Sequence, residues 1–86
     1  MKSILDNFLD EDGLVIQWPA KHSNKQLILE YLAQKFSMET SYSEKEINEI
    51  LKQWHTFGDW AILRRSLVDY GYMQRKAGGT EYHRLH

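Results

Sequence analysis

The sequence has no cysteine among its 86 residues and a single proline, Pro19. The lack of cysteine excludes disulfides and thiolate-bound metal sites, so apolar packing must hold the fold together. Hydrophobic residues make up 42% and aromatic residues 13% of the chain. This composition is sufficient for the core of one small domain and is not that of a disordered chain. We therefore expect a single domain over residues 1–86.

Long apolar runs are also missing, and the first residues lack the pattern of a secretory signal peptide. A membrane-spanning helix needs about 20 mostly apolar residues, and no stretch of this sequence approaches that length. The expectation is a cytoplasmic protein without a membrane partner.

An excess of positive charge is missing as well, since the formal net charge is -1. Tight, nonspecific binding of nucleic acid requires several cations that neutralise phosphates. The charge is uneven, however. Residues 1–50 hold five lysines and nine acids, whereas residues 51–86 hold six lysines and arginines and three acids. Either the basic C-terminal third contacts phosphates, or the unevenness is the chance distribution of a solvated surface.

Helical spacing of apolar residues predicts four helices. They cover residues 3–9, 24–36, 44–54 and 59–70. Side chains that can cap the first turn precede the last three helices. These caps are Ser23 with Gln26, Ser43 with Glu46, and Asp59. Gly71 is the expected stop of the last helix, because glycine adopts the left-handed conformation at little cost.

Three segments favour extended structure. The run Leu14–Trp18, rich in branched and aromatic side chains, predicts a strand that Pro19 ends. A strand stub is expected over 40–42. Two short strands are expected on either side of Gly78-Gly79, a pair that suits a tight turn, so a β-hairpin is expected over residues 72–85.

This order of elements predicts an α+β fold of the winged helix-turn-helix kind. It would have a three-helix core, a short N-terminal helix and a small antiparallel sheet. The helix over 59–70 would be the recognition helix, and the C-terminal β-hairpin would be the wing. The stub over 40–42 would be the third strand, and the strand over 14–18 would lengthen the sheet.

The two faces of the last helix differ in character. At about 100° per residue, Trp60, Leu63 and Leu67 are expected on the core side. The outer face is expected to present Ile62, Arg65, Ser66 and Asp69. Arg65 and Ser66 are therefore candidates for DNA contact. Arg65 and Asp69, four residues apart, are also spaced to pair with each other instead.

Arg64 is expected at the rim of the core, where its guanidinium needs a partner. One hypothesis is an internal ion pair with Glu44, Asp59 or Asp69. The other is an anion, such as a nucleotide, held by Arg64 together with Lys21, Lys25 and Arg75.

The predicted wing carries Arg75, Lys76 and Arg84. One interpretation is that these cations contact DNA phosphates, with a glycine tip that allows close approach. The other is that they are solvated charges that protect a sheet edge from stacking.

The sequence resembles a small bacterial domain family of unknown function, found alone or fused behind winged-helix transcription regulators of the ArsR and GntR kinds. The resemblance covers roughly residues 14–85. It rests on Pro19-Ala20-Lys21, Lys25, Leu29, Leu32-Ala33, Phe36, Tyr42-Ser43-Glu44, Glu46-Ile47-Asn48, His55, Asp59, Ala61, Leu63-Arg64-Arg65, Leu67-Val68-Asp69, Gly71, Arg75, Gly79 and Tyr82. It implies a winged-helix-like fold and a link to transcriptional control. It implies no reaction.

Signs of catalysis are lacking. The four histidines, His22, His55, His83 and His86, form no metal-ligand pattern. No phosphate loop or nucleophile elbow is present. His55 and Asp59 are spaced to lock a turn by a hydrogen bond. We therefore expect a protein that is not an enzyme and has no metal or cofactor.

Two functions follow from these patterns. The leading hypothesis is a domain of transcriptional regulation with weak DNA binding through the wing and the third long helix. The alternative is a protein–protein interaction module on the same scaffold, with a protein partner or a homodimer. The exposed position expected for Ile62 and the mild acidity favour the alternative.

Overall fold

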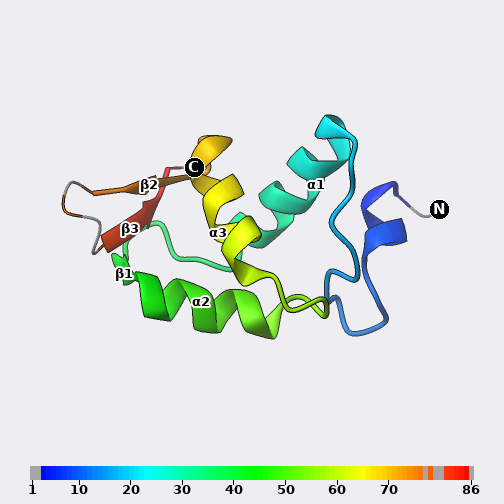
Figure 1. Cartoon of the computed structure of the whole chain (residues 1–86), viewed down its shortest axis with the longest axis horizontal. Coiled ribbons are helices and arrows are strands. Elements are labelled where there is room, and N and C mark those ends of the chain that lie inside the picture. The colour runs from blue at the N-terminus through cyan, green and yellow to red at the C-terminus, as the bar shows by residue number, and fades with distance from the viewer. Residues whose placement is uncertain (1–2, 77, 79–80, 86) are drawn as a thin grey trace.

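The structure, a computed structural model, describes residues 3–76, 78 and 81–85. In this part of the chain, three α-helices and a three-stranded antiparallel sheet follow a short 3-10 helix (Figure 1). The elements are η1 (Leu5–Phe8), α1 (His22–Ala33), β1 (Tyr42–Ser43), α2 (Glu44–Gln53), α3 (Trp60–Asp69), β2 (Met73–Arg75) and β3 (Glu81–Arg84). The prediction of an α+β fold with a small antiparallel sheet is therefore confirmed.

The N-terminal segment lies at the end of the molecule opposite the sheet (Figure 1). The strand predicted over 14–18 is wrong. Val15 forms single bridges with Leu9 and His55 and never joins the sheet. Its neighbours explain this, because the Val15 amide donates to the Trp54 carbonyl while the next amide, Ile16, donates to Phe8. Two different partners on successive residues anchor a linker but give no continuous ladder.

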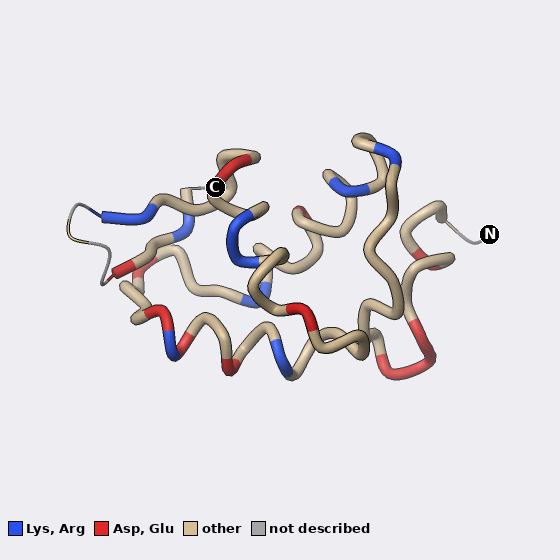
Figure 2. The backbone as a smooth tube through the Cα atoms, viewed as in Figure 1, with Lys and Arg blue, Asp and Glu red and all other residues tan. Residues whose placement is uncertain are grey.

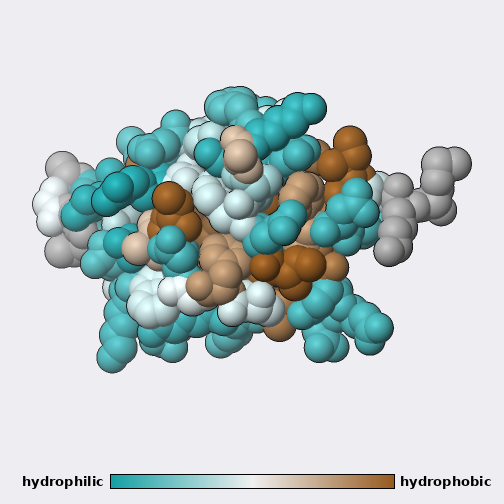
Figure 3. Space-filling model, turned by 45° about the vertical axis from the view of Figure 1, so that its right-hand side comes forward, coloured by the Kyte–Doolittle hydropathy of each residue, from teal (hydrophilic) through white to brown (hydrophobic). Residues whose placement is uncertain are grey.

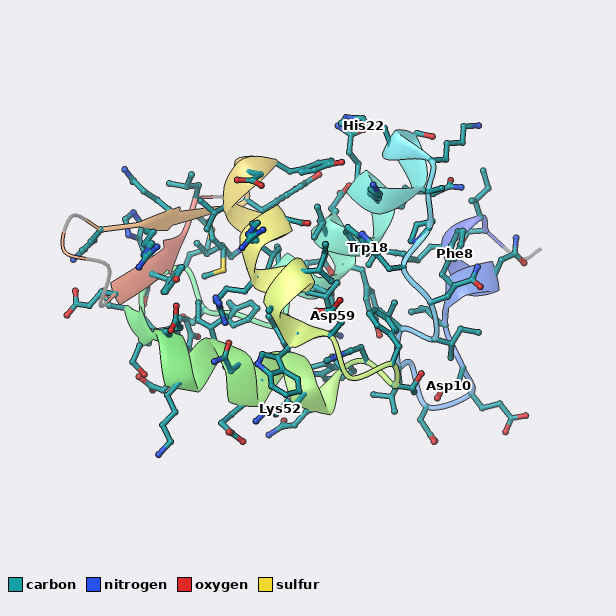
Figure 4. All side chains as sticks on the ribbon, in the orientation of Figure 1. Phe8, Asp10, Trp18, His22, Lys52 and Asp59 are labelled. Carbon is teal, nitrogen blue, oxygen red and sulfur yellow. The ribbon has the colours of Figure 1, made fainter. Side chains whose placement is uncertain are left out.

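The start of α1 also differs from the prediction. The helix begins at His22 after the cap residue Lys21, and no side chain caps it. Ser23 is therefore inside the first turn and is not the N-cap. A contact distant in sequence accompanies this early start. The His22 ring stacks on Tyr70 at 4.8 Å between centroids, and its Nδ1 lies 3.1 Å from the Tyr70 hydroxyl (Figure 4).

The starts of α2 and α3 confirm the local capping signals. The Ser43 hydroxyl accepts from the Glu46 amide, and the Glu46 carboxylate accepts from the Ser43 amide. Asp59 accepts from the Ile62 amide at the first turn of α3. Each bond joins residues three apart, so the sequence alone encodes it. None of the helices in the described residues is both long and apolar enough to cross a bilayer.

The sheet has the strand order β1-β3-β2. Tyr42 pairs with Tyr82, so the predicted stub lies beside the hairpin as expected, although it starts two residues later. Arg75 pairs with Tyr82 on the other side. Directly opposite residues of antiparallel strands share a face, so the Arg75 side chain lies on the face that buries Tyr82. Gly71 takes φ +82 after α3, which confirms the predicted stop. Gly79 and His86 lie outside the described residues.

The core face of α3 is rotated relative to the prediction. Leu63 and Leu67 are fully buried as expected, but Ser66 is also buried, at 9% exposure. Its predicted outward position is therefore wrong, because α3 is covered by α1 and β2 as well as by α2. Trp60 lies at the edge of the buried arc, with the Lys52 ammonium 4.4 Å from its ring. Ile62 is half-buried against the core rather than exposed.

Candidate functional site

A polar concavity of about 210 Å³ lies between α3 and the hairpin formed by β2 and β3. Its lining carries three arginines and two acids. The lining residues are Glu44, Arg64, Arg65, Val68, Asp69, Arg75 and Tyr82. We call this hollow the arginine concavity. It brings together residues from α2, α3 and both strands of the hairpin, so the tertiary fold is required to form it.

Arg64 forms the inner wall of the arginine concavity and is already paired. Its Nε lies 3.5 Å from Glu44 Oε1, and its Nη1 donates to the Asn48 side-chain oxygen. Glu44 and Asn48 are four residues apart on one face of α2, so they hold the two ends of one guanidinium. Of the partners considered for Arg64, the structure selects the internal ion pair with Glu44.

Tyr82 completes this network from the sheet. Its hydroxyl donates to Glu44 Oε1 at 3.1 Å. Burial raises the pKa of Tyr82, and the hydrogen bond to the Glu44 carboxylate raises that pKa further. The phenol therefore stays protonated and continues to donate to Glu44. Arg75 covers the same ring, with its guanidinium carbon 5.9 Å from the ring centroid.

Arg65 and Asp69 form the outer wall and are both exposed. Within the described part of the chain, no carboxylate oxygen lies within 4 Å of the Arg65 guanidinium, so the pair with Asp69 that their spacing suggested is not formed. Arg65 and Arg75 therefore project from two elements into one hollow, and neither forms an ion pair with a carboxylate among the described residues. Guanidinium groups in this arrangement suit a phosphate, whose oxygens accept bidentate hydrogen bonds.

The family model described as an uncharacterized protein conserved in bacteria (DUF2087) matches residues 15–84. The chain belongs to this family. No curated protein and no solved structure matches the chain. The match includes every residue that lines the arginine concavity.

The other hairpin cations of this DUF2087 domain have different surroundings. Lys76 lies outside the arginine concavity and pairs with Glu81 at 3.2 Å, where both side chains are about half exposed. Arg84 is half-buried and donates to the Phe36 carbonyl at 3.0 Å. Of the three hairpin cations considered for phosphate contact, Arg75 lines the arginine concavity, whereas Arg84 ties β3 to the segment after α1.

Lys21 and Lys25 lie at the start of α1 and are separated from the α3 and hairpin cations in Figure 2. Neither lines the arginine concavity. The Lys25 ammonium lies 5.7 Å from the Trp18 ring. The hypothesis that both lysines converge with Arg64 and Arg75 on one anion is therefore wrong.

His55 is held by contacts within the fold. The His55 Nδ1 donates to the Leu51 carbonyl, and its ring meets Phe57 edge-on. Asp59 caps α3, so the predicted bond between these two residues is replaced by two separate contacts. Among the described residues, no group of three or more His, Cys, Asp or Glu side chains could hold a metal.

Two lining residues of the candidate site, Val68 and Tyr82, were not predicted from the sequence as site residues. For Tyr82, the pairing with Arg75 across the hairpin was the available signal, because the register follows once the turn is placed. Glu44 was named only as one of three acids that could pair with Arg64.

A second hollow, of about 440 Å³, lies between η1 and α1. It is lined by Ser3, Ile4, Leu5, Leu27, Glu30, Tyr31 and Gln34. We call it the N-terminal groove. Ile4 on its edge is 59% exposed. Figure 3 shows apolar surface on the side of the molecule next to the N-terminus.

Proposed function

We propose that this chain is a winged-helix domain that binds duplex DNA weakly and acts in transcriptional regulation. In this proposal α3 is the recognition helix and the β2–β3 hairpin is the wing. The order of helices and strands supports it, because a β1 strand pairs beside a C-terminal hairpin that follows three helices. The sequence resemblance, which implies a link to transcriptional control, agrees with the proposal.

The arginine concavity carries the proposal. Arg65 comes from the outer side of α3 and Arg75 from the wing, and both line one hollow. A helix in the major groove and a wing beside it have a DNA strand between them, so a backbone phosphate would meet both guanidinium groups. The contact fixes the position of the domain on the duplex.

This domain is expected to discriminate little between DNA sequences. The exposed residues of α3 are Ala61, Arg65 and Asp69. Of these, only Arg65 can donate to a base edge, and Asp69 repels phosphates. Ser66 is buried and cannot reach a base. Binding is therefore expected to depend on phosphates and to tolerate many sequences, with affinity that falls steeply as salt rises.

Replacing Arg65 and Arg75 together with glutamine should lower DNA affinity by roughly tenfold or more at about 50 mM salt, because two charge-assisted phosphate contacts are lost. The slope of log affinity against log salt should fall by about two units. Fluorescence anisotropy with labelled duplexes of several sequences measures both quantities, and the loss should be equal across sequences.

Lys45→Gln is the matched control, because Lys45 is exposed on α2 and does not line the arginine concavity. It removes one unit of charge, as each single arginine variant does, and should change affinity much less. Absence of wild-type binding at low salt, or equal losses in Lys45→Gln and in each single arginine variant, would contradict the proposal.

The N-terminal groove supports a second candidate function, docking of a protein partner or a second copy of this chain. Its apolar lining and the exposed Ile4 favour this function. Ile62 does not contribute to such a surface, because it is half-buried against the core.

A further inference from the structure

We infer that Glu44 limits the DNA affinity of this domain by holding Arg64 away from the bound phosphate. The inference rests on the proposed function, since it concerns the strength of the same site. It makes Glu44 a positioning residue that touches no DNA and sets how many of the three arginines in the concavity are available.

Contacts with α2 hold the Arg64 side chain in place. Its side chain is 22% exposed and is held at both ends by α2, through Glu44 and Asn48. The Tyr82 hydroxyl holds Glu44 from the opposite side of the concavity. Arg64 therefore has its hydrogen-bonding groups turned toward α2, although it also lines the hollow in which Arg65 and Arg75 lie.

The two acids that line the arginine concavity, Glu44 and Asp69, differ in their ionic partners. Glu44 neutralises Arg64, whereas Asp69 forms no ion pair within 4 Å among the described residues. The two acids of one concavity therefore have different effects. Removing the charge of Glu44 releases a cation that is already inside the site. Removing the charge of Asp69 only reduces general repulsion.

Glu44→Gln is the direct test, because glutamine keeps the length of the side chain and can still accept the Tyr82 hydrogen bond. We expect duplex DNA affinity to rise about three- to tenfold at about 50 mM salt. The slope of log affinity against log salt should steepen by about one unit, because one further cation then faces the phosphate. Asp69→Asn is the matched control and should give a smaller rise with less change of slope.

Two Arg64 variants separate positioning from a general effect on the fold. Arg64→Gln alone should lower affinity, because it leaves the Glu44 carboxylate without its cation inside the arginine concavity. In the Glu44→Gln/Arg64→Gln double variant, affinity and slope should return to near the wild-type values. A merely structural role for Glu44 could not produce a gain in affinity that disappears with Arg64.

Two results would overturn the inference while leaving the proposed function in place. One is a Glu44→Gln affinity no higher than that of Asp69→Asn. The other is a Glu44→Gln/Arg64→Gln double variant that keeps the full gain of Glu44→Gln, which would mean that the gain does not come from Arg64. Failure of the proposed function would look different, because wild-type protein would then show no DNA binding at low salt.

Discussion

Leu63→Ala is expected to lower the free energy of unfolding by about 2–5 kcal/mol, the usual cost of a cavity at a fully buried leucine. Leu63 has no exposed surface and lies on the inner face of α3, which contacts both α1 and α2. Small domains are typically stable by only about 5–15 kcal/mol, so this loss is a large fraction of the total. Urea denaturation followed by circular dichroism measures it.

Arg65→Ala is the matched control, two residues further along the same helix but exposed. It should change the free energy of unfolding by only about 0.5 kcal/mol or less. This pair tests the orientation of α3, on which the site depends, because Arg65 faces the hairpin only if Leu63 faces the core. Equal losses in the two variants, or a larger loss for Arg65→Ala, would mean that α3 is oriented differently.

Gly13→Ala is expected to lower the free energy of unfolding by about 2–3 kcal/mol for two separate reasons. Gly13 has φ +81, a conformation that a residue with a Cβ adopts at a cost of about 1–2 kcal/mol. A Cβ there would also lie 2.9 Å from the Tyr31 hydroxyl, which donates to the Gly13 carbonyl at 2.6 Å. Displacing Tyr31 disturbs its contacts with Lys35 and Trp54.

Gly71→Ala separates the backbone cost of a positive φ from the steric cost of the contact with Tyr31. Gly71 has φ +82, but nothing lies within 4 Å of a Cβ added there, so only the backbone cost applies. The extra loss at Gly13 should largely disappear when Tyr31→Phe removes the hydroxyl that the new Cβ would meet. Thermal melts of the wild type, Gly13→Ala, Gly71→Ala, Tyr31→Phe and the Gly13→Ala/Tyr31→Phe double variant measure these losses. Equal losses at Gly13 and Gly71 would show that the turn at Gly13 does not depend on Tyr31.

The correct sequence predictions depend on residues that are close in the chain. The capping box of Ser43 with Glu46 and the Asp59 cap are both encoded within four residues. The stop at Gly71 depends on one residue that accepts a positive φ. The position of Arg64 at the core rim followed from its neighbours on the helix, since Leu63 and Leu67 face inward.

The errors involve contacts that are distant in the chain. His22 begins α1 early while stacking on Tyr70, which lies 48 residues away. The Val15 amide binds the Trp54 carbonyl, so a segment with strand propensity becomes a linker. The Arg84 guanidinium donates to the Phe36 carbonyl, again 48 residues away, and does not line the arginine concavity with Arg75. Local patterns cannot reveal such partners, which is why the arginine concavity could be predicted only in part.

The distribution of charge connects the fold with the proposed function. The cations at the start of α1 and those at the hairpin lie in different parts of the molecule (Figure 2). Of the hairpin cations, Arg75 borders the arginine concavity, which also contains the outer side of α3. The formal net charge of -1 therefore does not describe the local surface that would meet DNA. It does fit the proposed weak binding, because few cations would face the phosphates and Glu44 occupies one of them.

The most direct test of the central claim is a map of backbone amide shifts in nuclear magnetic resonance spectra during titration with duplex DNA at low salt. Our account predicts the largest shifts on the outer side of α3 and on β2, at Arg65, Asp69 and Arg75. Smaller shifts are predicted at Lys21 and Lys25, which lie outside the arginine concavity. Shifts concentrated around Ile4 and Leu27 in the N-terminal groove, or no shifts at all, would contradict the account.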